Sequence, residues 1–363
     1  MPEYMFSDTT IQGRFRGGDL AFLPEGKIAL FDQEGQIIEY DLAEKCEIDR
    51  DFVGSLAGVS LGAAIPVSGY LWSPSIPSQL PEMMAVATRG GHFVIRDLRD
   101  KSFHRLQPRE SGPVNCVAFS HIGDSLLIGV GDYPLSSRFS GAYLELYRVK
   151  EGKLEFVNTS KLPGFGHVYM ESCSNLAFVN STVLPGVCVD CLAWLNDNEA
   201  FCVTGARSQD HGFLIRFTPD PFRILAIRET TSAWARRLFV RYDSVVVQFP
   251  HEIVEFPFST KEKSAEAELD VYKFEAPSRL YESVTDLGLT DYDRPSDSLL
   301  LTDGTLLDIG TGEREQLLEP LPECFAIRGE LPFRAVALSE HGVLRCYQKA
   351  MQPGASSDHA RES

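Results

Sequence analysis

The stretch KIALFDQEGQIIEYDL, residues 27–42, shows how this chain is built. Two runs of β-branched and large apolar residues flank a short turn that contains Asp and Gly, which is the pattern of a β-hairpin. Seven such stretches follow one another along the chain, at 27–42, 83–98, 125–149, 199–217, 244–258, 298–309 and 334–348. Runs such as VVV at 245–247 do not alternate with polar residues, so these strands are expected to be buried on both faces.

The spacing of the hairpins indicates a closed, repeating architecture. Their first strands lie on average about 51 residues apart, close to the ~40–50-residue period of a propeller blade. Short apolar segments precede several hairpins, at 19–22, 69–72, 116–119 and 191–194, with a weaker copy at 238–239. Segments at 152–159 and 221–229 can supply a fourth strand. Radially packed blades bury both faces of their strands. The sequence therefore predicts an all-β propeller, with seven four-stranded blades.

In each predicted blade, the second strand of the hairpin is the third strand, and the residues at its end resemble those of a known family. Tyr40-Asp41, Arg96-Asp97 and Tyr147-Arg148 occupy matching places in the first three units. They resemble the WD40-type β-propeller, in which a Trp-Asp pair stands there, although later units lose the Asp and no Gly-His dipeptide occurs at its expected place. The resemblance implies a seven-bladed disc that acts as a binding platform. It also implies that the N-terminal segment, 4–15, closes the ring as the outer strand of the last blade.

The repeat assigns residues 1–350 to one propeller domain and leaves a polar tail at 351–363, which we expect to be disordered. Four segments exceed the repeat and are predicted to be insertions, at 132–141, 159–187, 206–212 and 259–282. Additional loops on a rigid scaffold often carry binding. We therefore expect partners to contact a propeller face or these insertions.

Charge and composition exclude several classes of protein. The chain has 363 residues and a formal charge of −17, from 34 Lys and Arg against 51 Asp and Glu. Direct nucleic-acid binding and an anionic membrane surface are therefore disfavoured, because both need many cations. The N-terminus shows no secretory signal, and no run approaches 18 apolar residues. With eight irregularly spaced cysteines, we expect reduced thiols and a cytoplasmic protein.

Motifs for catalysis lack their structural context. GVSLG at 58–62 matches G-x-S-x-G, but no helix pattern follows, so an inter-blade loop is expected. Asp291, Asp293 and Asp297 do not have the spacing of a calcium loop, and a solvated turn is expected instead. No phosphate-binding P-loop occurs. The sequence therefore predicts no catalytic residue, cofactor or metal, and no enzyme.

One metal site stays open as an alternative. Cys188 and Cys191 form a C-x-x-C motif, and His167 with Cys173 could complete four zinc ligands. Against this, Cys191 aligns with Cys116 in the repeat, which indicates that Cys191 packs as a small apolar residue.

Trp234 is the strongest candidate for contact with a partner. Trp72 and Trp194 occupy equivalent places in the repeat and are expected in the core, whereas Trp234 stands outside it. The run WARRLFVR, 234–241, adds a local positive feature to an acidic chain, and Trp and Arg dominate protein-protein hot spots. The predicted partner-binding residues are Trp234, Arg236, Arg237 and Arg241, with Arg89, Arg207 and His211 as weaker candidates. The alternative is a blade strand with solvated arginines and a partly packed Trp.

These observations favour a non-catalytic scaffold for protein-protein interaction, as a subunit of a larger complex. A variant of this hypothesis is a reader of acidic or phosphorylated peptides, bound by the arginines. The alternative from another class is a propeller enzyme, for example a metal-dependent hydrolase or lactonase. Its carboxylates would lie at the central channel, where residues from several blades converge.

Overall fold

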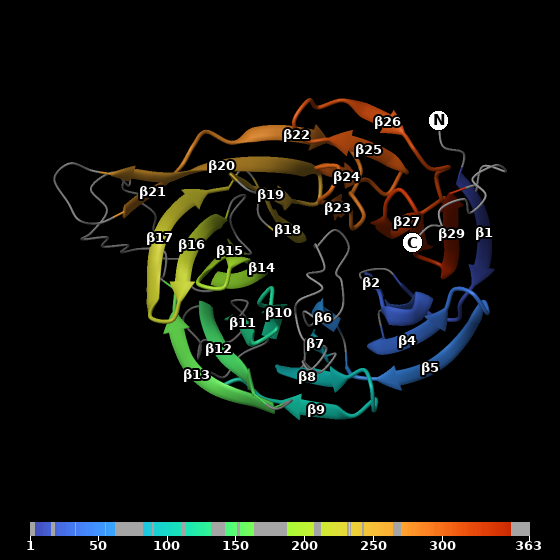
Figure 1. Cartoon of the computed structure of the whole chain (residues 1–363), viewed down its shortest axis with the longest axis horizontal. Coiled ribbons are helices and arrows are strands. Elements are labelled where there is room, and N and C mark those ends of the chain that lie inside the picture. Colours follow the sequence, from blue (N-terminus) through green and yellow to red (C-terminus); the bar gives the residue numbers. More distant parts are fainter. Residues whose placement is uncertain are drawn as a thin grey trace, which may run out of the picture.

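Seven antiparallel sheets stand around a central axis like the blades of a propeller (Figure 1). The computed structural model describes residues 4–15, 19–32, 34–54, 56–61, 83–88, 91–109, 114–131, 142–150, 153–162, 187–206, 212–230, 232, 234–241, 243–263 and 270–349. Apart from one short 3-10 helix, Pro24–Gly26, every element in these ranges is a strand. The predicted all-β propeller with seven blades is confirmed.

In blades 1 to 4 and in blade 6 the strands run outward from the axis in sequence order, whereas in blade 5 both β21 and β22 pair with β20 and in blade 7 the first strand of the chain lies outermost. Blade 1 contains β2 (Asp19–Phe22), β3 (Lys27–Phe31), β4 (Gln36–Asp41) and β5 (Cys46–Phe52), and blade 2 contains β6 (Leu56–Leu61), β7 (Met83–Thr88), β8 (His92–Asp97) and β9 (Phe103–Leu106). Blade 3 contains β10 (Val114–Phe119), β11 (Ser125–Gly131), β12 (Ala142–Lys150) and β13 (Lys153–Lys161), and blade 4 contains β14 (Val187–Asn196), β15 (Glu199–Ala206), β16 (Phe213–Pro219) and β17 (Phe222–Glu229). Blade 5 contains β18 (Arg237–Val240), β19 (Ser244–Gln248), β20 (Glu252–Lys263), β21 (Asp270–Phe274) and β22 (Ser278–Glu282). Blade 6 contains β23 (Asp291–Asp293), β24 (Ser298–Leu300), β25 (Thr305–Asp308) and β26 (Arg314–Gln316), and blade 7 contains β27 (Cys324–Glu330), β28 (Arg334–Ser339), β29 (Val343–Lys349) and β1 (Tyr4–Thr10).

Strand direction gives the disc two distinct faces. Because neighbouring strands are antiparallel, the second strand of each blade ends, and the third begins, on the face where the inner strand begins. We call this the insertion face, because the strand ends that flank the predicted insertions 132–141, 159–187 and 206–212 all lie there. The other side of the disc is called the opposite face.

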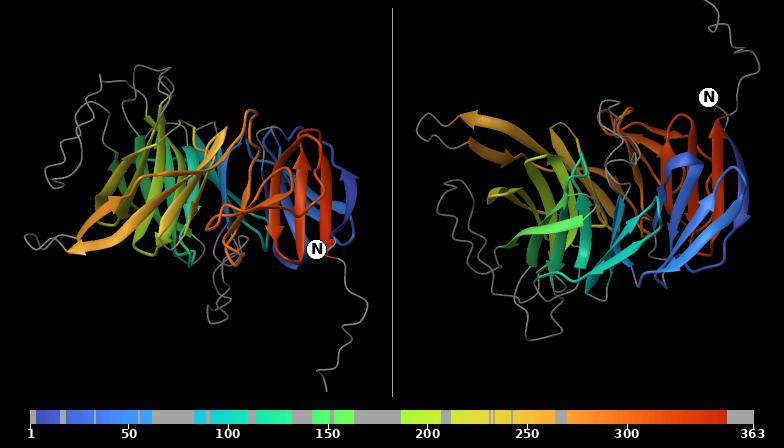
Figure 2. Two further views of the ribbon diagram at one scale, coloured as in Figure 1. Left: turned by 90° about the horizontal axis from the view of Figure 1, so that it is seen from above. Right: turned by 60° about the horizontal axis from the view of Figure 1, so that its bottom comes forward.

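The first strand closes the ring. β1 pairs with β29 over seven residues, from Tyr4 opposite Lys349 to Thr10 opposite Val343. It is the outermost strand of blade 7, and Figure 2 shows it in blue beside the red strands of that blade. The predicted closure by the N-terminal segment is therefore confirmed.

The register also confirms that the first three units are equivalent. Tyr40, Arg96 and Tyr147 each lie opposite the second residue of the preceding strand. After them, the carboxylates of Asp41 and Asp97 accept hydrogen bonds from backbone N–H groups two residues further on. An aspartate at this place therefore stabilises the turn to the outer strand.

Arg96 is completely buried where blades 1 and 3 place a tyrosine. Its Nη2 lies 2.9 Å from a carboxylate oxygen of Glu39 and 3.1 Å from oxygens of Asp49 and Asp51, and its guanidinium stacks over Phe103. These acids belong to blade 1, so a charged cluster joins two neighbouring blades. Burial of such a charge is tolerated only because its partners are present.

Buried apolar clusters also lie between neighbouring blades. The cluster between blades 3 and 4 contains Trp194, whose side chain is buried and whose Nε1–H donates to the carbonyl of Ala118 at 2.9 Å. Cys116 and Cys191 are buried on the two sides of blade 4. The predictions of a core Trp194 and a packed Cys191 are confirmed.

Blade 2 differs from the prediction. Its inner strand is β6, Leu56–Leu61, which pairs with β7. The segment 69–72, with Trp72, lies outside the described residues. Gly58 and Ser60 thus lie on a strand, so the expected loop over this part of 58–62 is wrong. Small residues such as Gly and Ser are poor strand formers, and pairing with β7 overrides that local preference.

The expected linker 259–282 contains two strands. β20 continues to Lys263, β21 pairs with its distal half and β22 with its proximal half. The β20–β21 hairpin extends beyond the disc (Figure 2, orange). Two strands therefore share the outer position of blade 5.

Candidate interaction surface

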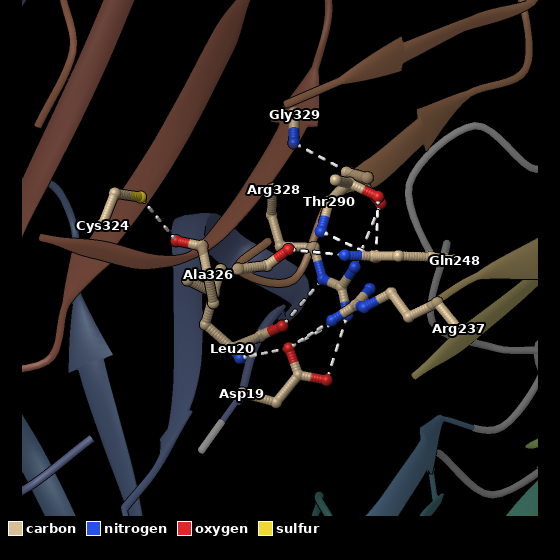
Figure 3. A network of polar contacts seen from close by, with 11 residues as sticks. Asp19, Leu20, Arg237, Gln248, Thr290, Cys324, Ala326, Arg328 and Gly329 are labelled. Carbon is tan, nitrogen blue, oxygen red and sulfur yellow. Dashed lines mark hydrogen bonds and ion pairs between the residues drawn. The ribbon is translucent and has the colours of Figure 1, made fainter. Parts of the chain in front are cut away.

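Arg237 lies at the centre of the ring (Figure 3). It is the first residue of β18 in blade 5, and its Nη2 lies 2.6 Å from Oδ1 of Asp19 at the start of β2 in blade 1. Blades 6 and 7 separate these two blades in the ring. The Arg237 side chain is only 11% exposed, because it reaches across the axis.

A second arginine completes what we call the axial network, formed by Asp19, Arg237, Asp291 and Arg328. Arg328 on β27 contacts both carboxylate oxygens of Asp19 at 3.1 and 3.2 Å, and its Nη1 lies 3.1 Å from Asp291 on β23. Its Nε–H donates to the carbonyl of Leu20 (Figure 3). Two arginines thus balance two aspartates, and the network joins blades 1, 5, 6 and 7.

The placement of Asp291 and Asp293 corrects a prediction. Both lie on the inner strand β23 and are buried, so the expected solvated turn is wrong for them. Asp291 also accepts a hydrogen bond from the backbone N–H of Gly329 at 2.9 Å, and Asp293 accepts one from Ser296. A carboxylate on an inner strand is removed from water and needs hydrogen-bond donors from the protein, because burial of a charge without such partners costs free energy.

A buried amide extends the contacts beside the axis. Nε2 of Gln248 donates to the carbonyl of Gly288 at 2.6 Å, and its Oε1 accepts from both the N–H and the hydroxyl of Thr290. The two axial aspartates are paired with arginine, which suits a structural role better than metal binding or hydrolysis. Over the described part of the chain, no cluster of three or more His, Cys, Asp or Glu side chains could hold a metal ion.

The three arginines of the 234–241 run point to different places. Nη2 of Arg236 lies 2.7 Å from Asp286 on the insertion face, and Arg237 lies on the axis. Arg241 lies at the opposite face, where it contacts Asp297 and Glu255. The structure does not gather them into one patch, because each pairs with an acid of the chain.

Trp234 is presented on the insertion face. Its side chain is 41% exposed, and its backbone has φ of +68°, a conformation that residues other than glycine seldom adopt. The next residues are held firmly. The Ala235 carbonyl accepts from the Cys191 thiol at 3.2 Å, and the Arg236 N–H donates to the carbonyl of Gln248 at 2.8 Å. Blades 4 and 5 thus fix the main chain after Trp234.

Asp190 lies on β14, the inner strand of blade 4, where it is the extra residue of a bulge. The Cys188 thiol donates to Oδ1 at 3.1 Å, whereas Oδ2 is buried with no hydrogen-bond partner. Burial raises the pKa of Asp190 to about 7. A Cβ on Gly205 would lie 2.4 Å from Oδ2, so only glycine leaves room for this carboxylate.

The zinc alternative gains no support from the two described cysteines. The thiols of Cys188 and Cys191 both donate to protein oxygens, and burial raises the pKa of Cys191 well above its ordinary value. His167 and Cys173 lie outside the described residues.

The weaker candidates Arg89, Arg207 and His211 also lie outside the described residues. The adjoining ends of the strands that flank them, β7 with β8 and β15 with β16, lie at the insertion face. Sequence reasoning missed the axial network, because Asp19 and Arg237 stand 218 residues apart. Within the described residues, no helix has the length and apolar character needed to cross a membrane.

Comparison with known proteins supports the fold. The β-propeller domain of Cps50 (Swd1) from Myceliophteria thermophila is similar over 96% of this chain and 100% of that domain, with a TM-score of 0.63 and 12% identity. In all, 1263 chains of solved structures match. No protein-family model and no curated protein matches the sequence. At 12% identity this likeness concerns the fold alone, which is the seven-bladed β-propeller expected from the WD40-type resemblance.

Proposed function

We propose that this protein is a non-catalytic scaffold that binds a protein partner on its insertion face, as a subunit of a larger complex. The presentation of Trp234 carries the proposal. A large aromatic side chain stands 41% exposed in an unusual backbone conformation, and hydrogen bonds hold the main chain that follows it. Tryptophan is among the residues that dominate binding energy, and a preorganised side chain loses less entropy on binding.

The topology supports the same face. A stable interface buries roughly 800 Å² on each partner, which is more than one tryptophan can provide. The strand ends that flank 132–141, 159–187 and 206–212 lie on the face that presents Trp234, so these segments are proposed to supply further contacts. Arg236 is proposed to contribute at the margin, where it pairs with Asp286.

Affinity purification of the full chain from its native source, followed by quantitative mass spectrometry, tests this proposal. We expect one stoichiometric partner with the unaltered chain and its loss with Trp234→Ala. Phe333→Ala is the matched control, because Phe333 is an aromatic residue that is 73% exposed on the opposite face. A chain that retains no partner and instead turns over a small molecule would overturn the proposal in favour of a propeller enzyme.

A further inference from the structure

We propose that the axial network couples blades 5, 6, 7 and 1, so that these four blades open as one cooperative unit, distinct from blades 3 and 4. This inference goes beyond the proposed function, because it concerns how the ring itself opens and does not depend on a partner. It rests on a circuit of hydrogen bonds that passes through the four blades and returns to the blade where it starts (Figure 3).

The first half of this circuit runs between neighbouring blades. Gln248 of blade 5 donates to the carbonyl of Gly288 at 2.6 Å and accepts from Thr290, so it binds the chain that enters β23 of blade 6. The same stretch also binds blade 7, because the Leu289 N–H donates to the carbonyl of Phe325 at 2.6 Å. Hydrogen bonds therefore connect blades 5, 6 and 7 in succession.

The second half of the circuit crosses the axis. Arg328 of blade 7 contacts Asp291 of blade 6 and Asp19 of blade 1, at 3.1 Å in each case. Arg237 of blade 5 then contacts Asp19 at 2.6 Å, and this last contact spans the ring instead of linking neighbours. The circuit thus closes on blade 5.

Burial of charge makes this circuit cooperative. The four side chains of the axial network are between 7% and 23% exposed, and each acid is paired with an arginine from another blade. Removal of one partner from a buried ion pair is costly, because it leaves a buried charge uncompensated. If one of these blades opened alone, it would leave such a charge in another blade. The opening of one blade therefore favours the opening of the others.

Blades 3 and 4 are joined in a different way. The Cys116 thiol donates to the carbonyl of Val189 at 3.4 Å, and the indole of Trp194 donates to the carbonyl of Ala118, so both contacts link neighbours. The cluster around them is apolar, and separation of apolar surfaces leaves no isolated charge. Blade 2 shares the Arg96 cluster with blade 1, so blades 3 and 4 provide the comparison.

Hydrogen exchange of the full chain, followed by mass spectrometry, tests this inference with Arg237→Met. The substitution lies in blade 5, yet we expect exchange to accelerate at least about tenfold in β2, β23 and β27 as well as in β18, and to change less than about twofold in β10 and β14. Arg236→Met is the matched control, because this adjacent arginine pairs with the exposed Asp286 and does not cross the axis. Exchange in β2 should be the same in Arg236→Met as in the unaltered chain.

A second measurement needs no variant. In the unaltered chain, low concentrations of urea should reduce protection in β2, β18, β23 and β27 with one common slope, and in β10 and β14 with a different one. Acceleration confined to β18 in Arg237→Met, or separate slopes for the four strands, would overturn the coupling across the axis. Equal acceleration in all these strands, or one slope for all of them, would also overturn the inference, because the whole ring would then open as one unit.

Discussion

At the scale of single residues, Arg96 shows how far one side chain can depart from a repeat. Blades 1 and 3 place Tyr40 and Tyr147 at this position, whereas blade 2 buries a guanidinium among three carboxylates. The cluster is stable only while both signs of charge are present, because a buried charge without a partner is costly.

We predict that Arg96→Met lowers the free energy of unfolding by about 3 kcal/mol, because it leaves Glu39 and its neighbours without their buried cation. Urea denaturation measures this. Arg99→Met is the control, because Arg99 is an exposed arginine that pairs with Asp97, and its loss should cost less than about 1 kcal/mol. Equal effects of the two substitutions would contradict a structural role for the cluster.

Residues were predicted well where the repeat itself was informative. Trp194 fell on a repeat position and is buried, and Trp234 fell outside one and is exposed. The local sequence predicts a solvated turn for Asp291, whereas the structure pairs it with Arg328 beside the axis. This pairing depends on which side chains come together when the ring closes, and the local sequence does not contain that information.

At the scale of elements, β1 is attached by charge as well as by backbone pairing. The Asp8 carboxylate receives two hydrogen bonds from Arg345 on β29, at 2.7 and 2.8 Å, and these lower its pKa. Because the pKa of Asp8 is lower in the folded chain than in the unfolded one, the pair stabilises the fold above the ordinary pKa of about 4 and is lost as the pH falls below it.

We therefore predict that Asp8→Asn reduces stability at pH 6 by about 1 kcal/mol and has a smaller effect at pH 3. Thermal unfolding of both chains at the two pH values checks this. Glu313→Gln should have little effect at either pH, because Glu313 is exposed and has no ion pair with any residue that the structure describes. An Asp8→Asn deficit that grows on acidification would contradict the expected sign.

Strands were predictable where apolar runs were dense, and less so elsewhere. All seven second and third strands were found from their hairpins, and the closing strand followed from the family resemblance. β6 was missed because LAGVSL contains small residues, while the more aromatic 69–72 competed for the same place. β21 and β22 were missed because their residues are charged and pair with an unusually long β20.

At the scale of the whole molecule, closure of the ring depends on the first strand. Removal of residues 1–10 would leave β29 with an unpaired edge, and such edges promote association between chains. We predict that this truncation lowers the thermal midpoint by about 10 °C or more and produces oligomers. Light scattering coupled to size exclusion detects the oligomers. A truncated monomer with an unchanged midpoint would contradict this role of β1.

The fold could be predicted because seven successive hairpin repeats, whose strands need burial on both faces, fit few architectures other than a closed propeller. Function was not, because 1263 solved chains match this architecture and a shared fold does not define an activity. The segment after Trp234 is held by hydrogen bonds from the Cys191 thiol to the Ala235 carbonyl and from the Arg236 N–H to the Gln248 carbonyl. The proposed function therefore depends on that segment more than on the propeller as such.

The most direct measurement is the affinity of the purified partner for three forms of the full chain, determined by calorimetry under identical salt and pH. We predict that Trp234→Ala weakens binding about 30-fold or more, the equivalent of about 2 kcal/mol, and that Phe333→Ala stays within about twofold of the unaltered chain. Equal affinity of the unaltered chain and Trp234→Ala would contradict the claim that this protein binds its partner through the insertion face at Trp234.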